Sequence, residues 1–478
     1  MNRRELLTQG VAAGAVTAGE MFHLPETRKA MPDDASVAVP RANGLGWVDV
    51  RDQGATGDGV TDDRAAVVAA ANLAAEATDR STLYFPAGTY LINDGPPPSI
   101  GDNVTVVGEG AASVLKRGAG ATYFALLVNR DYAENTAGNR NIAIHNLSFD
   151  ANGANQDPPF DQFKHCIALI GVRNAVVRGC RFYNLSGDGV VVSSTSDATD
   201  RPNQSRMIRI VENDFEGGTN GRNGISIIDA ADVVISSNTF TGVAADTHPG
   251  GIDLEPDLPG QDITNVIVVG NTFENCRQGI QAYGGIRMAT GVKRGLVITG
   301  NTVRGSRNQG MGIRVSAWDQ VSVTGNTIAE TAHSGIFIED ANQVAVSGNA
   351  VRGSGLEETA PGIWLKNCPY IVVTGNTVHD SQGDAYRVDR CDMFTLSGNS
   401  GRGWDNGNTG RHYGIRGVNG SIGGIVTANT FDGGNRPRTT LLVTQRGCRD
   451  WNVANNLFRN VGRKFNLSGR NRVADDSN

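Results

Sequence analysis

A four-residue phrase, clearest at Gly270-Asn271-Thr272-Phe273, recurs through the second half of the chain. Asparagines at equivalent positions follow one another at intervals of 23 to 33 residues. A repeat of this length is typical of a solenoid, in which each unit buries its apolar side by stacking on its neighbours. The equivalent asparagines are Asn213, Asn238, Asn271, Asn301, Asn326, Asn349, Asn376, Asn399, Asn429 and Asn456.

Each repeat contains two short runs in which apolar and polar residues alternate. One run precedes the asparagine, as at 266–269, and the other follows a glycine, as at 279–283. Alternation with a period of two is typical of a half-buried strand, and no stretch between the runs has helical spacing. Strands and turns in units of about 25 residues are typical of one coil of a parallel β-helix. The sequence therefore predicts an all-β fold, a single-stranded right-handed parallel β-helix with about ten or more coils.

The repeated asparagine has a structural explanation. At the same turn of each coil its side chain can bond the equivalent asparagine of the next coil. Asparagine also tolerates the left-handed backbone that a sharp turn needs. Cys180 occupies this position in its own repeat and is given the same structural role. We expect these residues to hold the coils together and not to catalyse a reaction.

Composition excludes some classes of partner. The 478 residues include 62 glycines and 19% charged residues, and the net charge is −6 without a basic run. Nucleic acid and anionic membranes are therefore poor partners. No apolar segment reaches the roughly 18 residues of a membrane span. The six cysteines form no metal-binding pattern; Cys368 and Cys391 share one register in adjacent coils, either as stacked thiols or as a disulfide.

The beginning of the chain has the features of an export signal. Arg3 and Arg4 precede a mildly apolar run that ends near Gly19, and this resembles a twin-arginine signal. The alternative is an irregular start with a chance arginine pair. The polar, proline-containing stretch from Glu20 to Asn43 is interpreted as a linker. The signal predicts a periplasmic or secreted protein exported by the twin-arginine route.

The segment 54–63, Gly-Ala-Thr-Gly-Asp-Gly-Val-Thr-Asp-Asp, followed by Leu-Tyr-Phe-Pro-Ala-Gly-Thr-Tyr at 83–90, carries a family resemblance. It resembles the opening of the pectate-lyase-like β-helix superfamily, in the branch with rhamnogalacturonase-type and epimerase-type chains. The resemblance implies a capping helix from Arg64 to about Ala77, begun by Asp62 or Asp63. Such a helix would cover the open strand edges at one end of the solenoid.

The predicted organisation has four parts. Residues 1–43 form the export signal and linker, 44–100 the N-terminal cap and first coil, 101–460 the β-helix repeats, and 461–478 the C-terminal tail. Two activities of the superfamily cannot be carried over residue by residue. The polygalacturonase set (Asn-Thr-Asp, Asp-Asp and Gly-His-Gly) is absent from the matching strands, and so is the epimerase-type Asp-Pro-His.

One face of the predicted solenoid combines aromatic and charged residues. In the strands that begin Gly-Ile, the second and fourth residues point inward, so the third and fifth point outward. Aromatic side chains beside fixed polar groups are typical of a sugar-binding site. The alternative is that β-propensity placed the aromatics there and that opposite charges pair between coils. The predicted substrate-binding residues are Gln281, Tyr283, Phe337, Glu339, Trp364, Lys366, Arg387 and Asp389, with His248 just before one of the strands.

Asp253 and Glu255 are the predicted acid/base pair. They stand two apart on one strand, so both carboxylates face outward, with Cα atoms about 6.6 Å apart. Glycoside hydrolysis uses two carboxylates, and separations of about 6.5 to 9.5 Å suit inversion. Arg314 is the predicted electrostatic partner of the pair. The alternative is that the two carboxylates pair with Arg314 or bind a stray cation without catalysis.

The sequence thus predicts an exported carbohydrate-active enzyme that cleaves glycosidic bonds of a polysaccharide. One rival is a lyase or C5-epimerase acting on uronates, with Arg314, Lys366 or Arg387 in the reaction. The other is a non-catalytic glycan-binding or envelope solenoid. No cofactor is expected, except a Ca²⁺ ion if the protein is a lyase. The expected assembly is a monomer or a homotrimer.

Overall fold

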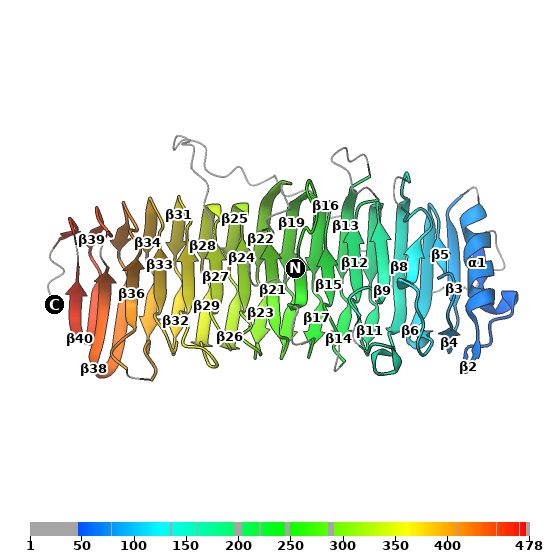
Figure 1. Cartoon of the computed structure of the whole chain (residues 1–478), viewed down its shortest axis with the longest axis horizontal. Coiled ribbons are helices and arrows are strands. Elements are labelled where there is room, and N and C mark those ends of the chain that lie inside the picture. The colour runs from blue at the N-terminus through cyan, green and yellow to red at the C-terminus, as the bar shows by residue number, and fades with distance from the viewer. Residues whose placement is uncertain are drawn as a thin grey trace. The chain divides into compact units, whose positions relative to one another are not determined.

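The computed structural model describes residues 46–77, 79–133, 136–159, 161–195, 203–218, 221–243, 249–284, 291–407, 409–445, 447–467 and 469–474. The expected export signal and linker at 1–43 lie outside these described residues, and so does His248. From Gly46 onward the chain winds into coils that stack along one axis (Figure 1). Strands of successive coils pair in parallel, which confirms the predicted β-helix.

The strands form three ladders. Most coils contribute one strand to each ladder, and four long strands each run through two ladders. The first ladder, which carries the candidate site, consists of β5 (Ser99–Ile100), β7 (Ala125–Asn129), β9 (His165–Ile170), β12 (Val190–Ser193), β15 (Ile225–Ile227), β18 (Gly250–Leu254), β21 (Gln278–Tyr283), β24 (Ile313–Ser316), β27 (Ile336–Glu339), β30 (Ile363–Lys366), β33 (Tyr386–Asp389), β36 (Tyr413–Val418) and the later part of β38 (Thr430–Thr444).

The other two ladders close the coil. The second ladder consists of β1 (Trp47–Asp49), β3 (Ser81–Phe85), the first parts of β6 (Val104–Arg117) and β8 (Arg140–Asp150), β10 (Arg173–Arg178), β13 (Ser205–Val211), β16 (Ala230–Ser236), β19 (Ile263–Val269), β22 (Lys293–Thr299), β25 (Asp319–Thr324), β28 (Asn342–Ser347), β31 (Ile371–Thr374), β34 (Phe394–Ser397), β37 (Ile425–Thr427), β39 (Asn452–Ala454) and β41 (Arg472–Val473). The third ladder consists of β2 (Asp58–Asp62), β4 (Gly88–Ile92), the later parts of β6 and β8, β11 (Arg181–Tyr183), β14 (Asp214–Glu216), β17 (Thr239–Thr241), β20 (Thr272–Glu274), β23 (Thr302–Arg304), β26 (Thr327–Thr331), β29 (Ala350–Ser354), β32 (Thr377–His379), β35 (Ser400–Arg402), the first part of β38 and β40 (Leu457–Asn466).

The core repeats from coil to coil because strands pair in constant register. Ile252, Ile280 and Ile313 stack at one position of the first ladder, and all three are buried. On the third ladder, phenylalanine rings stack nearly parallel, with centroids 4.7 Å apart for Phe182 and Phe215. Stacking buries each apolar side chain against its equivalents above and below, which a single coil cannot do alone.

The asparagine ladder is present as predicted. Side-chain amides bond from coil to coil without a break from Asn213 to Asn456, as in the 2.9 Å bond from Asn238 to Asn271. One detail of the expectation is wrong: the preceding residue takes the left-handed conformation, as Gly270 does with φ of +65°. Glycine has no Cβ and adopts this conformation at no steric cost.

The helix α1 (Arg64–Glu76) covers the N-terminal end of the solenoid, as expected from the family resemblance (Figure 1). Its buried side includes Val67 and Ala71. Asp63 precedes the helix, but its carboxylate accepts hydrogen bonds from the backbone N–H groups of Thr56 and Gly57, not from the helix. The 3₁₀ turns Val50–Gln53 and Gly153–Asn155 complete the helical elements among the described residues. No described helix is long and apolar enough to cross a membrane.

Candidate functional site

The outer face of the first ladder, turned away from the core, carries the residues singled out in the sequence. Register places Asp253 beside Gln281, Gln281 beside Arg314, and so on to Arg387, in one column along the solenoid. A second column runs from Tyr283 through Glu339 to Asp389. The predicted inward and outward phase of these strands is therefore correct. The first column is Ser226, Asp253, Gln281, Arg314, Phe337, Trp364 and Arg387.

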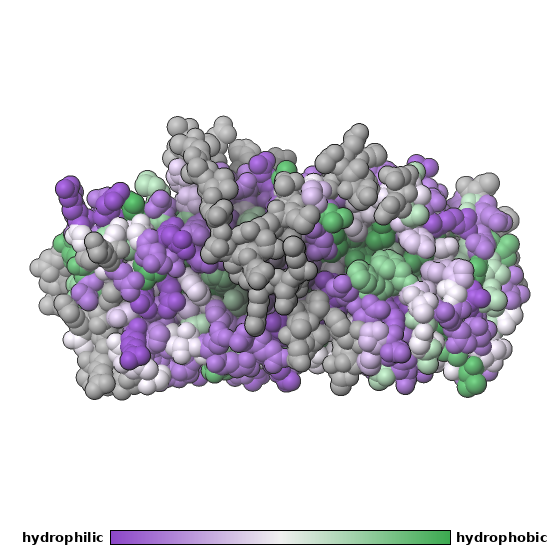
Figure 2. Space-filling model, viewed as in Figure 1, coloured by the Kyte–Doolittle hydropathy of each residue, from purple (hydrophilic) through white to green (hydrophobic). Residues whose placement is uncertain are grey.

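The surface changes character along this face. Towards α1, the outer side of β7, β9 and β12 carries a small apolar cluster that includes Val128, Ala168 and Val191. Figure 2 shows a hydrophobic area over these strands, and hydrophilic residues farther towards the C-terminal coils. Asp253 lies between these two regions.

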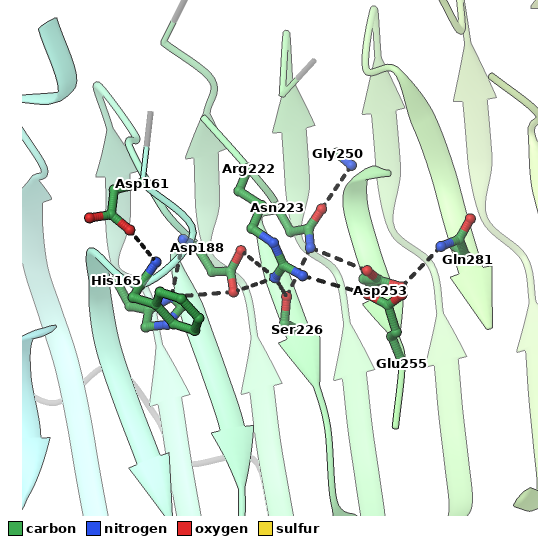
Figure 3. A network of polar contacts seen from close by, with 11 residues as sticks. Asp161, His165, Asp188, Arg222, Asn223, Ser226, Gly250, Asp253, Glu255 and Gln281 are labelled. Carbon is green, nitrogen blue, oxygen red and sulfur yellow. Dashed lines mark hydrogen bonds and ion pairs between the residues drawn. The ribbon is translucent and has the colours of Figure 1, made fainter. Parts of the chain in front are cut away.

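A buried polar network surrounds the predicted acid/base pair (Figure 3). It consists of His165, Asp188, Arg222, Asn223, Ser226, Asp253, Glu255 and Gln281. Five successive strands, β9 to β21, position these side chains, and three of them come from turns just before β12 and β15. Asp253 is 0% exposed and Glu255 is 4% exposed, so the network is removed from bulk water.

Arg222 is the hub of the network. Its Nη1 donates to Oδ1 and Oδ2 of Asp188 at 3.1 and 2.9 Å, and to Oγ of Ser226 at 3.2 Å. Its Nη2 lies 3.5 Å from Oε2 of Glu255. One guanidinium therefore compensates two carboxylates from different coils. On the far side of Asp188, the Nδ1 atom of His165 accepts a hydrogen bond from the Asp188 backbone N–H at 3.2 Å.

Asp253 is held by neutral donors and by its neighbouring acid. Asn223 and Gln281 donate to its two oxygens at 3.4 and 3.3 Å, distances that make weak bonds. Glu255 stands two residues farther along the same segment and acts directly on the acidity of Asp253. Since two buried carboxylates this close repel each other strongly, the pair favours having one member protonated.

The surroundings give Asp253 and Asp188, two carboxyl groups of this network, very different pKa values. Burial, together with the charge of Glu255, raises the pKa of Asp253 well above its ordinary value. Burial also raises the pKa of Asp188, but Arg222 and His165 outweigh it and bring that pKa to about 2. Asp253 therefore favours its protonated form, whereas Asp188 is a carboxylate at neutral pH. Carboxyl groups separated in this way can act as acid and base.

Two expectations about this pair need correction. The two carboxyl groups act directly on each other, which does not suit inversion, where a separation of about 6.5 to 9.5 Å leaves room for a water. Their electrostatic partner is Arg222, and Arg314 instead pairs with Glu339 at 2.9 Å. Arg314 stands two coils from Asp253, about 9–10 Å along the ladder, while Glu339 is on the next coil. The long side chain reaches the nearer acid.

The aromatic residues do not offer open faces to a sugar, contrary to expectation. Phe337 is only 5% exposed, and its ring lies 4.7 Å from that of Trp364. The guanidinium of Arg314 lies 4.8 Å from the centroid of the Tyr283 ring, and that of Arg387 lies 5.0 Å from the Trp364 ring. Cation–π attraction explains this placement, because the ring faces carry negative potential. The surface therefore presents guanidinium groups supported by aromatic rings.

These cations belong to a cationic patch, which we define as two triplets with a carboxylate at the centre of each. Glu339 pairs with Arg314 at 2.9 Å and with Lys366 at 3.1 Å. Asp384, fully buried, pairs with Arg387 at 2.6 Å and lies 3.9 Å from Arg416. Each triplet has two cations around one anion, so each triplet has one positive charge in excess.

The histidines beside the patch do not add to this excess, and Glu358, 3.7 Å from His333, offsets part of it. Burial lowers the pKa of His333 and of His412, so neither adds charge at neutral pH. Asp389 accepts a hydrogen bond from Asn419 at 2.8 Å and pairs with Arg390 at 3.5 Å. In a protein with a net charge of −6, a local positive excess favours anionic ligands.

Sequence reasoning missed Asp188, Arg222, Asn223 and Asp384. They lie in turns before the strands, where inward and outward alternation has not begun. A signal was nevertheless available: a polar residue precedes the strand-opening glycine in several coils, as at Asp188-Gly189, Asn223-Gly224 and Gln278-Gly279. Among the described residues, no group of three or more His, Cys, Asp or Glu side chains could hold a metal ion.

Comparisons with known proteins agree with this architecture. Residues 47–290 match the family model described as rhamnogalacturonase A/epimerase, pectate lyase-like, and residues 264–472 match a right-handed β-helix region. The coils are therefore those of a right-handed parallel β-helix. The chain is 39% identical over 119 residues to mannuronan C5-epimerase AlgE1 of Azotobacter vinelandii. That match covers 23% of this chain and only 8% of the epimerase.

Two solved structures share the fold at low sequence identity. The A-module of mannuronan C-5 epimerase AlgE4 from Azotobacter vinelandii superimposes with a TM-score of 0.54 at 18% identity, covering 90% of this chain and all of the module. The family 28 exopolygalacturonase of Yersinia enterocolitica superimposes with a TM-score of 0.51 at 13% identity, covering 91% of this chain and 79% of the enzyme. Because the family model matches just over half of the sequence, the chain belongs to the rhamnogalacturonase A/epimerase, pectate lyase-like family.

Proposed function

We propose that this protein is an enzyme of acidic polysaccharides that removes a proton beside a uronate carboxyl group. The products are either an unsaturated chain end, by β-elimination, or a sugar inverted at C5. The observation that carries the proposal is that Asp253 and Glu255 lie two residues apart on one segment, both buried, with the pKa of Asp253 raised well above its ordinary value. Their two carboxyl groups lie together, so they can act only on one side of a sugar ring.

The chemistry follows from the different protonation of the pair. Glu255, compensated by Arg222, is placed to accept the C5 proton. Asp253, whose raised pKa favours its protonated form, can donate a hydrogen bond to the substrate carboxylate as negative charge develops there. In β-elimination the bond between C4 and the glycosidic oxygen breaks, and the proton of Asp253 is available to the departing oxygen. In epimerisation water supplies the proton that returns to C5 from the opposite face, because the pair acts on one side only.

The cationic patch supports a polyanionic substrate. It begins at Arg314, about 9–10 Å from Asp253 along the same column, and continues over the following coils to Arg416. A uronate chain lying along the column would place its carboxylates over the two triplets. The local sequence match to mannuronan C5-epimerases supports the same class of substrate.

Hydrolysis of glycosidic bonds is the second candidate function. The raised pKa of Asp253 favours it, because a general acid must hold its proton at neutral pH. Inverting hydrolysis also needs a base on the opposite face of the sugar, and retaining hydrolysis needs two carboxyl groups about 5 Å apart. The contact between Asp253 and Glu255 fits neither arrangement, so we place hydrolysis second.

The test uses the full chain with alginate, polygalacturonate and a neutral glucan, in deuterated water. We expect deuterium at C5 of a uronate if the enzyme epimerises, or absorbance from unsaturated ends if it eliminates. Asp253→Asn and Glu255→Gln should each reduce this exchange by about 10²–10⁴-fold. The matched control Thr272→Ala changes an exposed residue of the third ladder and should leave it unchanged.

The other outcomes separate the rivals. New reducing ends with neither deuterium at C5 nor absorbance from unsaturated ends would favour hydrolysis. Binding of a uronate polymer without any exchange or cleavage would mean a glycan-binding solenoid. Equal exchange by wild type and Asp253→Asn would overturn the proposal.

A further inference from the structure

Arg222 lies between two carboxylates that come from different coils. Asp188 precedes β12, Arg222 precedes β15, and Glu255 follows β18, so the three side chains cross three successive coils (Figure 3). Asp188 takes two contacts with Nη1 at about 3 Å, while Glu255 takes one at 3.5 Å with Nη2. The single guanidinium is shared unequally, with the closer contacts going to Asp188.

We propose that Arg222 is a positioning residue whose charge, divided between Asp188 and Glu255, decides which carboxyl group of the Asp253/Glu255 pair carries the proton. This inference rests on the proposed function only for its effect on a reaction. The placement of the proton itself is a property of the unliganded protein. Asp188 thereby tunes the pair from two coils away, without touching it.

The charges around Asp253 support this role. From the β15 side it is faced by Arg222, with the neutral Asn223 and Ser226, and from β21 by the neutral Gln281. On its own segment it is faced by Glu255. Arg222 is therefore a cation in direct contact with this pair, with its Nη2 3.5 Å from Oε2 of Glu255. A change in the balance of charge around Arg222 should therefore change the proton affinity of Asp253.

More distant titratable groups act through these contacts. His165 lies beyond Asp188, at 3.2 Å from its Oδ2, so it influences the pair through Asp188. Tyr283 occupies the β21 position beside Glu255, and its ring supports Arg314. Arg314 is itself held by Glu339, so its charge is largely compensated one coil away from the pair.

Two substitutions should act in opposite directions. Asp188→Asn removes an anion, so Arg222 stays fully charged towards Glu255 and Asp253, and the proton leaves Asp253 at lower pH. Arg222→Met removes the cation, so the proton is held to higher pH. A shift on the order of one pH unit is expected in each case, because a charge within about 4–6 Å moves a carboxyl pKa by that amount or more.

The experiment follows the carboxyl carbons of Asp and Glu by carbon-13 NMR over a pH series in the full chain. Asp253→Asn identifies the resonance of Asp253. The double variant Asp188→Asn/Arg222→Met removes one charge of each sign and should titrate close to wild type. Arg222→Lys keeps the charge and should lie between wild type and Arg222→Met. Arg178→Met breaks a similar pair with Glu212 at 2.8 Å on the surface and is the matched control.

Shifts of opposite sign, cancelled in the double variant, are the expected result. A merely structural role would give shifts of the same sign, or none, and would overturn the proposal. If Arg222→Met does not fold, as circular dichroism would show, Asp188→Asn and the double variant still decide the sign. Titration as expected without any action on uronates would leave Arg222 in its role and reject the proposed function. Exchange on uronates with titration that does not shift in the variants would support the proposed function and reject the role of Arg222.

Discussion

The side-chain amide of Asn271 donates a 3.0 Å hydrogen bond to the side-chain carbonyl oxygen of Asn301 on the next coil. The backbone N–H of Asn271 donates to the same oxygen, also at 3.0 Å. Asn301 in turn donates to Asn326 and to the backbone carbonyl of Val268. One buried side chain therefore satisfies polar groups on three successive coils.

Asn301→Ala should lower the free energy of unfolding by about 3 kcal/mol or more. It leaves the backbone N–H and amide of Asn271 and the carbonyl of Val268 without these bonds, and each buried unsatisfied group costs about 1–3 kcal/mol. Urea unfolding followed by circular dichroism measures the loss. The control Thr302→Ala changes the next, exposed residue and should stay within about 0.5 kcal/mol. An equal loss in both variants would mean that the ladder adds nothing to strand packing.

The same ladder explains why so much of the fold could be predicted. A repeated asparagine fixes the phase of every coil, and from that phase the outward position of Asp253 and of Trp364 follows. The structure places both on the outer column in the expected register. One coil has Cys180 in place of the asparagine, and there the backbone N–H of Cys180 still donates a hydrogen bond to the side-chain oxygen of Asn213.

The partners of the site residues could not be predicted in the same way. Arg222 and Asp188 lie in turns, whose side-chain directions depend on local backbone angles and not on alternation. Arg314 had two candidate acids, Asp253 and Glu339, and only their distances decide between them. Exposure of Phe337 was also unpredictable, because it depends on which neighbours cover the strand. The strand pattern thus predicts where a residue lies along the face. It does not predict which neighbour a long side chain contacts.

Asp253→Asn should change how stability depends on pH. Burial and the charge of Glu255 raise the pKa of Asp253 above 3.8 in the folded protein. Between 3.8 and the raised pKa, the folded state binds more protons than the unfolded chain, so the unfolding free energy falls as pH rises. The variant lacks this titration. As pH rises above about 4, it should gain stability relative to wild type in urea unfolding, by about 1 kcal/mol or more in total. A difference that does not vary with pH would contradict the assignment of the proton to Asp253.

Asp188→Asn should act in the acid range. Burial opposes ionisation of Asp188, but Arg222 and His165 overcome it and bring the pKa to about 2. A lowered pKa gives stability that is present above about pH 4 and is lost as pH falls through 2. The variant should therefore be about 2–3 kcal/mol less stable than wild type at neutral pH and should converge with it near pH 2. Parallel acid-unfolding curves for the two proteins would contradict this role.

The thiols should be inert in the folded protein. All six cysteines are free and buried. Burial raises the pKa of Cys166, Cys180 and Cys276 to about 12, so the reactive thiolate is scarce at neutral pH. A thiol reagent should modify the native protein very slowly and should count six thiols after unfolding without reductant. Four thiols would instead indicate a disulfide, with Cys368 and Cys391 as the first pair to examine.

Glu339→Gln should strengthen binding of an anionic glycan. Glu339 bonds Arg314 at 2.9 Å and Lys366 at 3.1 Å, and these cations outweigh burial and lower its pKa, so it is ionised at neutral pH. Its removal frees two partly exposed cations, which should raise affinity for a uronate oligomer about two- to ten-fold, with solvent limiting the gain. Arg387→Met should lower the same affinity, because it removes a cation from the other triplet.

Calorimetric titration at two salt concentrations measures the effect of Glu339→Gln. The gain should shrink at high salt, since screening weakens attraction between exposed charges. A neutral oligosaccharide of equal length is the matched ligand control, and its affinity should not change. If Glu339→Gln and wild type bind the uronate oligomer equally at low salt, the cationic patch does not contact the substrate. In that case Arg314 and Lys366 serve only to neutralise Glu339, and the anionic substrate must be recognised elsewhere on the solenoid.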